Sequence, residues 1–410
     1  MNRNNSHRQK TAGLIRYSCS VLFMLFSFCY LFFLQGEILA EAQFVYSKGI
    51  TTYNLFVGAV IITVVLQIVQ WIVGLASRLP SRWHALSYLP SMLMLAIVTD
   101  VDKAAMAHFS FGPWKWIAPL ILCVYVLLVL FANRVDGGYN GAAHDLKSQL
   151  YPNYIILFFL ILAVGSTPQT SDVYHFELKA ERLILNQDYE AATRVGEKSL
   201  KTNRRLTQLR MYALSKLGQL PERLFEYPQY DGSRGLLDVT DTLDSYRVSV
   251  HRICLHLGAF CGKSIHSTER YYELMLADSV WNQHTADYYL CSLLLDKNLK
   301  EFQRQLPKYY DLSDSIPDAY NRLPKAYREA LLLQGDRKQA LQGKLVMGTD
   351  TLATFTDADF IQQFKEYNET KKSFSDPIER VNKTHRLFGK TYWWYYDYSD
   401  QAIGELKRRR

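Results

Sequence analysis

Hydrophobic and polar positions divide this chain into two unlike parts. Before about residue 165, long apolar runs dominate and charges are sparse, whereas after about residue 172 charged residues recur every few positions. No apolar run in the second part approaches the roughly 18 residues that a membrane-spanning helix needs. The pattern therefore predicts an all-α chain, in which an N-terminal transmembrane helical bundle precedes a soluble helical domain.

The first part predicts a transmembrane domain with about five helices. A bilayer core of about 30 Å requires about 20 helical residues at 1.5 Å each, so the third and fifth apolar segments are short. The five segments are residues 17–34, 54–76, 84–98, 116–131 and 153–164.

Basic residues in the short loops set the expected orientation. Four Lys and Arg residues precede the first apolar segment, and Arg78 and Arg82 separate the second segment from the third. Cytoplasmic loops retain Lys and Arg, so we expect a cytoplasmic N-terminus, and five crossings then place the second domain outside the cytoplasm. A signal peptide cleaved near Ala40 is the alternative for the first segment, and it leaves the same sidedness.

These features predict four regions. The chain would carry a basic cytoplasmic N-terminus, a transmembrane domain, an extracytoplasmic helical domain with an aromatic-rich end, and a basic tail. Their expected bounds are residues 1–16, 17–165, 166–398 and 399–410.

The second part repeats a pattern of helices and turns. Apolar residues at spacings of three and four predict helices, and turn-forming stretches occur at residues 186–189, 218–221, 296–299 and 335–338. Their separations of about 31 and about 39 residues bracket the period of tetratricopeptide (TPR) units, which are antiparallel helix pairs.

The repeat is imperfect. Gly196 stands where a TPR unit usually has a large residue, and residues 236–260 are expected to form a longer helix that interrupts the array. The prediction is therefore a TPR-like domain, with an irregular helical bundle as the alternative.

Charge and motifs narrow the classes of function. The 410 residues carry a formal net charge of +8, but the basic residues form no stripe and no nucleic-acid-reading motif, so we expect no nucleic-acid partner. The sequence contains none of the motifs typical of α/β-hydrolases, zinc metalloproteases, nucleotide-binding or dinucleotide-binding proteins. Their absence makes an enzyme the less favoured interpretation, and we expect no cofactor.

The six cysteines include no CxxC pair, so neither a disulfide framework nor a structural zinc site is predicted. Three of them, Cys254, Cys261 and Cys291, lie in the second part. Their disulfide status stays open, with a bond between Cys261 and Cys291 as one alternative if this part is exported.

His251, Cys254, His256 and Cys261 have the side chains of zinc ligands. On one continuous helix His251 and Cys254 share a face, His256 points elsewhere, and Cys261 lies about 10 Å further on. Four ligands would converge only if the helix broke near Gly258. We therefore predict no metal site, with buried cysteines and surface histidines.

Two polar pairs in the membrane part are candidate functional residues. Gln67 and Gln70 share one face of the second segment, where such amides either line a polar path or, as we favour, hydrogen-bond a neighbouring helix. Asp100 and Asp102 end the third segment. Paired carboxylates at a membrane edge can serve as acid and base or hold a cation, although an ordinary solvated loop has the same composition.

The aromatic stretch 392–398 contains the remaining candidates, Trp393 and Trp394. Aromatic rings with polar tips can stack on sugars or lie at a membrane interface, and they also fill helical cores. We favour the core or the interface over ligand stacking.

The ending Phe388-Gly389-Lys390-Thr391-Tyr392-Trp393-Trp394-Tyr395-Tyr396, after a few N-terminal spans and a degenerate TPR-like domain, resembles a group of uncharacterised Bacteroidota membrane proteins. The resemblance implies an inner membrane and a periplasmic domain, and it brings no known activity.

The resulting hypothesis is a non-enzymatic cell-envelope protein. The lipid bilayer would hold it, and its helical domain would bind a protein or peptide outside the cytoplasm. The alternative is a membrane-embedded enzyme or transport subunit acting on a glycan or lipid-linked substrate. The sequence leaves the oligomeric state open.

Overall fold

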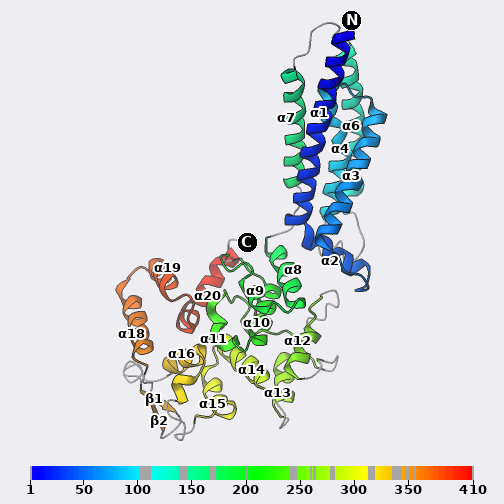
Figure 1. Ribbon diagram of the computed structural model, residues 1–410. Helices are drawn as coiled ribbons and strands as arrows, with labels where there is room; N and C mark the ends of the chain where they lie inside the picture. Colours follow the sequence, from blue (N-terminus) through cyan, green and yellow to red (C-terminus); the bar gives the residue numbers. More distant parts are fainter. Residues whose placement is uncertain are drawn as a thin grey trace. The chain divides into compact units, whose positions relative to one another are not determined.

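The computed structural model describes most of the chain as helices (Figure 1). Apart from the helices it contains one antiparallel hairpin within the described part, β1 (Lys344–Met347) paired with β2 (Thr351–Thr354). The predicted helical class is thus confirmed. The described residues are 2–100, 112–137, 146–166, 172–199, 201–240, 247–258, 261, 265–277, 282–312, 319–334, 344–347, 351–354 and 357–408.

The chain forms two compact units, Met1–Leu178 and Lys179–Arg410. They meet inside one helix, α8 (Asp172–Leu185). The boundary predicted from composition falls at residues 166–171, of which 167–171 lie outside the described residues.

Long apolar helices dominate the first unit, where they run side by side (Figure 1). They are α1 (Asn2–Cys29) with its π-helical extension η1 (Tyr30–Leu34), α3 (Leu55–Ser77), α6 (Trp114–Gly137) and α7 (Leu146–Ser166). Four stretches are long and apolar enough to cross a membrane: Ala12–Leu34, Leu55–Ser77, Trp114–Val135 and Lys147–Ser166. They contain the first, second, fourth and fifth predicted segments, and the fifth is longer than its apolar run because α7 begins before it.

The third predicted segment folds differently. A 3-10 helix, η2 (Ser81–Tyr88), leads directly into a short α-helix, α4 (Leu89–Thr99). A 3-10 helix rises about 2.0 Å per residue and an α-helix 1.5 Å, so these eight and eleven residues together extend about 32 Å. The tighter winding gives a short segment the length of a full span.

The combined η2–α4 element is the centre of the first unit. Ala85, Tyr88, Met92 and Leu95 are almost completely buried in its core. The element packs against α1, α3 and α7, and α4 also contacts α6. Its neighbours therefore cover it on several sides.

Asn153 of α7 holds the start of η2. Its Oδ1 accepts the Ala85 backbone N–H at 2.7 Å, and its Nδ2 donates to the carbonyls of Ser81 at 2.9 Å and Gln149 at 2.7 Å. The Ala85 N–H is buried, and a buried N–H without a partner is costly in an apolar bundle, so this one amide satisfies it.

A short helix, α2 (Gly36–Tyr46), follows the π-helical turn. Its Ile38 and Ala42 form a small core with Tyr174 and Leu178. Gly36 fits the bend closely, because a Cβ there would lie 2.7 Å from the Leu55 side chain and 3.2 Å from a backbone oxygen, and these neighbours would have to move.

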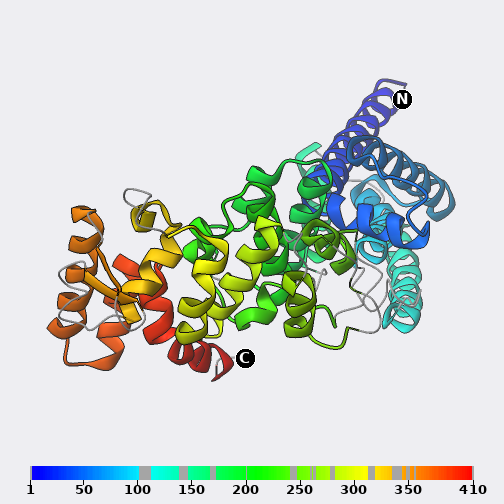
Figure 2. The same ribbon diagram turned by 90° about the horizontal axis from the view of Figure 1, so that it is seen from below.

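The second unit is a succession of helices that follow the chain order, as the colours from green to orange show in Figure 2. Its helices after α8 are α9 (Tyr189–Arg194), α10 (Arg204–Lys216), α11 (Leu220–Arg223), α12 (Val250–Leu257), α13 (Thr268–Ala277), α14 (Gln283–Leu295), α15 (Leu299–Tyr309), α16 (Lys325–Gln334), α18 (Ala358–Ser373), α19 (Pro377–Phe388) and α20 (Tyr392–Arg408). Short 3-10 turns are η3 (Leu224–Glu226), η4 (Gly232–Gly235) and η5 (Ala319–Arg322).

Three turns between paired helices have the same hydrogen bonds. Each contains one residue of positive φ: Gln187 at 63°, Gly218 at 68° and Lys297 at 57°. The next N–H reaches back to a carbonyl of the preceding helix: Asp188 to Leu183 at 2.9 Å, Gln219 to Leu214 at 2.9 Å and Asn298 to Leu293 at 2.8 Å. The N–H groups of the positive-φ residues donate to the carbonyls three positions earlier, which belong to Ile184, Ser215 and Leu294.

These paired bonds define a Schellman motif, which satisfies the last carbonyls of a helix. The motif confirms the turns predicted at residues 186–189, 218–221 and 296–299. The fourth predicted turn, at residues 335–338, lies outside the described residues.

The stretch between α11 and α14 interrupts the array, as expected, but it contains short helices and not the single long helix that was predicted. The long helix predicted over residues 236–260 is wrong, since α12 begins after Ser249 and ends at Gly258, which has a φ of 116°. Ser249 accepts the Arg252 N–H as its cap. A capping serine and a left-handed glycine bound a helix of only eight residues.

Candidate functional site

Gln67 and Gln70 link two elements of the bundle. Gln67 Nε2 donates to Gln70 Oε1 at 2.8 Å, Gln70 Nε2 donates to Ser87 Oγ at 2.9 Å, and Ser87 Oγ donates to the His84 carbonyl at 2.8 Å. The amides thus join α3 to η2. Gln67 Oε1 and Thr63 Oγ1, one turn earlier, are buried without a hydrogen bond to any described residue.

Asp100 lies where α4 ends. Its Oδ2 accepts the indole N–H of Trp114, the first residue of α6, at 2.8 Å. Asp102, its predicted carboxylate partner, lies outside the described residues. The carboxylate of Asp100 therefore ties the end of one helix to the beginning of the next.

A second polar cluster surrounds Tyr30 at the π-helical turn. The Tyr30 hydroxyl accepts Gln35 Nε2 at 3.2 Å, donates to the Val164 carbonyl at 3.4 Å and lies 3.5 Å from Thr99 Oγ1. Since Thr99 precedes Asp100, both clusters lie at the same end of the bundle. Sequence reasoning missed Tyr30 because it stands inside an apolar run, yet π-helical turns occur often at functional sites.

Trp393 is a core residue of the second unit. Its ring is fully buried, and its centroid lies 5.0 Å from that of Phe364 and 5.6 Å from that of Phe360. Its indole N–H donates to the Glu329 carbonyl at 2.9 Å. Trp394 is half-buried, with its ring 4.5 Å from that of His385. Trp393 and Trp394 therefore both pack against side chains of the second unit itself.

The carboxylate of Glu329 is buried beneath the same aromatic helix. It accepts the Tyr392 backbone N–H at 2.6 Å, and Lys325 Nζ lies 4.0 Å away. Burial raises the pKa of Glu329 to about 7 because the charged form loses its hydration, and the lysine offsets only part of that loss.

A second buried carboxylate, Asp287, joins three helices. It accepts the hydroxyls of Tyr310 at 2.6 Å and Tyr327 at 3.1 Å, and Gln283 Nε2 at 3.3 Å. Burial raises the pKa of Asp287, and these donors offset part of the effect. The Tyr327 hydroxyl also lies 3.7 Å from Cys291 Sγ, so this thiol belongs to the same cluster.

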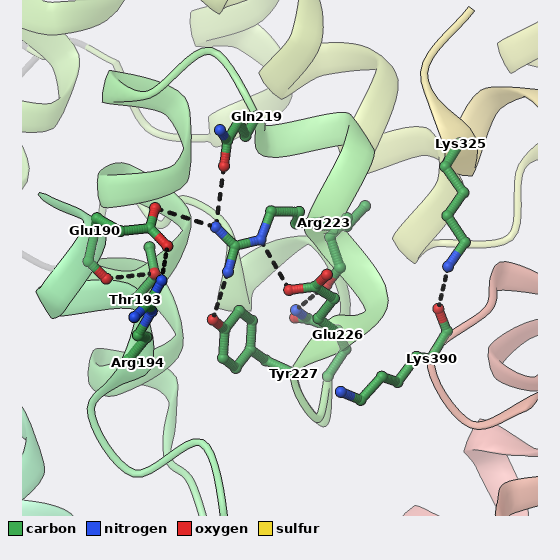
Figure 3. Close-up of polar contacts among 11 residues, drawn as sticks. Glu190, Thr193, Arg194, Gln219, Arg223, Glu226, Tyr227, Lys325 and Lys390 are labelled. Atoms are coloured by element: carbon green, nitrogen blue, oxygen red, sulfur yellow. Dashed lines mark hydrogen bonds and ion pairs between the residues drawn. The ribbon is translucent and has the colours of Figure 1, made fainter.

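Arg223 organises a polar network on the surface of the second unit (Figure 3). Its guanidinium donates to Glu226 at 2.8 Å, Gln219 at 3.0 Å, Tyr227 at 3.3 Å and Glu190 at 3.4 Å. The Arg223 side chain is 20% exposed, whereas that of Glu190 is 43% exposed. The network joins α9 to α11 and leaves carboxylate oxygens facing water.

The prediction of no zinc site assumed one continuous helix through Cys261, and this assumption is wrong. The chain leaves the helix at Gly258, and Cys261 Sγ lies 3.3 Å from His251 Nδ1. Within the described residues, however, no group of three or more His, Cys, Asp and Glu side chains is arranged to hold a metal ion. All six thiols are free in this structure.

Together the two units define a helical protein with several apolar helices of membrane-spanning length and a second helical unit rich in charge. The chain belongs to a family of unknown function, DUF6057, whose model matches residues 103–261 and 261–399. No curated protein and no solved structure matches the chain.

Proposed function

We propose that this chain is an integral protein of the cell envelope, with its N-terminus in the cytoplasm and its second unit in the periplasm. The second unit is a TPR-like array that binds a protein or peptide partner, and the chain itself is not an enzyme. The inner-membrane and Bacteroidota placement comes from the resemblance of the aromatic ending.

The outward faces of the long helices support membrane insertion. Trp116, Leu127 and Phe131 on α6 are 81%, 66% and 62% exposed. Apolar surface on this scale is costly in water and neutral in a hydrocarbon core. Because η2–α4 matches the length of a bilayer core, we count it as a fifth crossing. An odd number of crossings leaves the two ends of the bundle's chain on opposite sides of the membrane.

The observation that carries the proposed binding role is the turn repeated at Gln187, Gly218 and Lys297. Identical turns bring successive helix pairs back in the same direction, which is how helical repeats build an extended concave surface for partners. The first helices of the pairs begin at Asp172, Arg204, Gln283, Lys325 and Ala358. Three of the four intervals lie near the TPR period of about 34 residues or are somewhat longer, and the interval from Arg204 to Gln283 is more than twice as long because it contains the interruption.

Family membership supports treating both units as one functional protein. The matched segments include α6 and α7 as well as nearly all of the second unit. Replacing the bundle by one unrelated span should therefore impair function, whereas a bundle that serves only as a tether would be replaceable.

Site-specific photocrosslinking in intact cells tests the binding role. A photoreactive residue at the exposed position Arg194, beside the Arg223 network, should capture a reproducible envelope protein. The same residue at Leu387 on α19, which is 65% exposed, is the matched comparison. If neither these positions nor a scan of the exposed faces of α8 to α16 captures a reproducible partner, the binding role is refuted.

Reporter fusions test the orientation separately. Alkaline phosphatase joined after Ser166 should be active, and a cytoplasmic fluorescent protein at that position should be dark. The opposite result would place the second unit in the cytoplasm.

The alternative function is a membrane-embedded enzyme or transport subunit for a glycan or lipid-linked substrate. The observation that favours it is the pair of polar clusters around Tyr30 and Asp100 at one end of the bundle. Asn replacing both Asp100 and Asp102 should then abolish complementation of a deletion strain, and full complementation would remove the support for this alternative.

A further inference from the structure

The end of α12 brings two thiols and an imidazole together. Cys254 lies on the last turn of the helix, and its carbonyl accepts the Gly258 N–H. Gly258 has a φ of 116°, which reverses the chain and returns Cys261 to the helix. There Cys261 Sγ lies 3.3 Å from His251 Nδ1, and the Cys254 and Cys261 side chains hydrogen-bond to each other.

Packing holds both partners of this pair. Cys254 is fully buried and Cys261 is 8% exposed. The Tyr271 hydroxyl of α13 donates to the Cys254 carbonyl at 3.0 Å, which fixes the backbone beneath the first thiol. The two thiols lie close enough to act on each other's ionisation, and a disulfide between them requires a sulfur–sulfur distance of about 2.05 Å.

The surroundings make the two thiols unequal. The pKa of Cys261 falls to about 6, because its thiolate accepts a hydrogen bond from Cys254 and is also stabilised by His251. The pKa of Cys254 is raised, because it donates the hydrogen bond and is more deeply buried. Cys261 therefore ionises first, and the thiolate is the nucleophile in disulfide chemistry.

We infer that Cys254 and Cys261 form a disulfide with each other, and that Cys261 is the attacking thiol. The inference rests in part on the proposed export of the second unit, since disulfides persist in oxidising compartments. The oxidant is a disulfide-bearing dithiol protein, which reacts with Cys261, the more exposed of the two thiols.

The exchange balances in two steps. The Cys261 thiolate attacks one sulfur of the oxidant, forms a mixed disulfide and releases the other sulfur as a thiolate. Cys254 then loses its proton to His251 or water and attacks Cys261 Sγ, which expels the oxidant's second thiolate. Two electrons pass to the oxidant, and the two thiol protons are released.

Cys291 does not compete for this bond. Its sulfur lies beside the Tyr327 hydroxyl on the contact between α14 and α16, whereas the pair belongs to α12 and the residues after it. The alternative pairing of Cys261 with Cys291, left open by the sequence, would require both thiols to leave these contacts.

Peptide mapping of the wild-type full-length protein tests the pairing without any mutation. Trypsin cuts after Arg252 and Lys263, so one fragment carries both Cys254 and Cys261, and Cys291 falls in another. Membranes are quenched with acid and alkylated in denaturant. The first fragment should be lighter by two hydrogens and unalkylated until reduced, while the Cys291 fragment should be alkylated at once.

Variants and a purified-protein arm separate the possible outcomes. Cys254→Ser and Cys261→Ser should each leave the other thiol open to alkylation, whereas Cys291→Ser should keep the disulfide. Purified full-length protein in detergent should form the same bond when equilibrated with oxidised glutathione. His251→Gln should raise the midpoint of the alkylation pH profile of Cys261 by about one unit, an effect that loss of packing alone would not give.

Oxidation of the pair in the purified protein but not in cells supports the pairing and refutes the exported placement instead. Free thiols under both conditions, a bond to Cys291, or zinc released from the purified protein on alkylation of this pair would each overturn the inference.

Discussion

Replacing Glu329 by Gln should remove the pH dependence of stability that this residue imposes on the second unit. Glu329 has a raised pKa of about 7 in the folded protein, against the ordinary value of 4.5 for a glutamate. Between these two values the folded state binds more protons than the unfolded state, so the free energy of unfolding falls as pH rises. The stabilisation is fully present below about pH 4.5 and is lost as pH increases through 7.

The magnitude follows from the size of the difference. One pKa unit corresponds to 1.36 kcal/mol, so ionisation of Glu329 costs about 3 kcal/mol of stability by pH 8. Gln is a neutral isostere of protonated Glu and keeps an oxygen for the Tyr392 N–H. The variant should match the wild type near pH 5 and exceed it by about 3 kcal/mol at pH 8, even though it gives up the 4.0 Å contact with Lys325.

Urea unfolding of the full-length protein in detergent, followed by far-UV circular dichroism at pH 5, 6, 7 and 8, measures this difference. Glu369→Gln, on the exposed face of α18, is the matched control and should leave the pH dependence unchanged. Parallel stability curves for the wild type and Glu329→Gln would refute the reasoning, because a carboxylate without linkage to folding cannot be the buried group described here.

Three further predictions use the same titrations. Gln187→Gly should stabilise the protein by about 1 kcal/mol and Gly218→Gln should destabilise it by a similar amount, because only glycine takes positive φ without strain. Since no atom lies within 4 Å of a Cβ at Gly218, the second change introduces no clash. Changes of the same sign in the two variants would contradict this reasoning. Burial lowers the pKa of His256 to about 3, below the ordinary value of 6.5 for a histidine, so acidification from pH 7 to 4 should remove about 3 kcal/mol from the free energy of unfolding through this residue. His256→Asn should abolish that loss, and a loss of the same size in the variant would refute the assignment. Asn153→Leu should lower the free energy of unfolding by about 2 kcal/mol, since it leaves two backbone groups of η2, the Ala85 N–H and the Ser81 carbonyl, without this partner. An unchanged urea midpoint would refute that role.

The sequence predicted those features that depend on neighbouring residues. Apolar runs indicated the long helices, since hydrophobicity and length suffice for a helix that faces lipid. The turns were visible because Asn186, Asp188 and Asn298 favour helix boundaries, and Asp188 and Asn298 do cap the helices that follow. The aromatic ending was recognised as a cluster, although only the fold shows that Trp393 fills the core.

Features that depend on distant residues were not predictable. Sequence spacing on one helix separated Cys261 from His251, and the reversal at Gly258 brought them together. The glycine was a visible warning, but its position alone did not decide between continuing the helix and ending it. The polar cluster at Tyr30 likewise depends on partners contributed by α4 and α7, which no local pattern reveals.

The third apolar segment shows why hydropathy underestimates a buried span. Its serines lower the apparent hydrophobicity, yet Ser87 and Ser91 are fully buried and each donates to a backbone carbonyl, as does the buried Thr99 directly after the segment. A helix surrounded by protein can carry such residues because their partners come from its own turns and from neighbours, whereas a lipid-facing helix cannot. The same enclosure permits the 3-10 winding, since Asn153 supplies a hydrogen bond that the tighter helix lacks. The short third segment, which contains a histidine and two serines, is therefore the one we expect at the centre of the bundle.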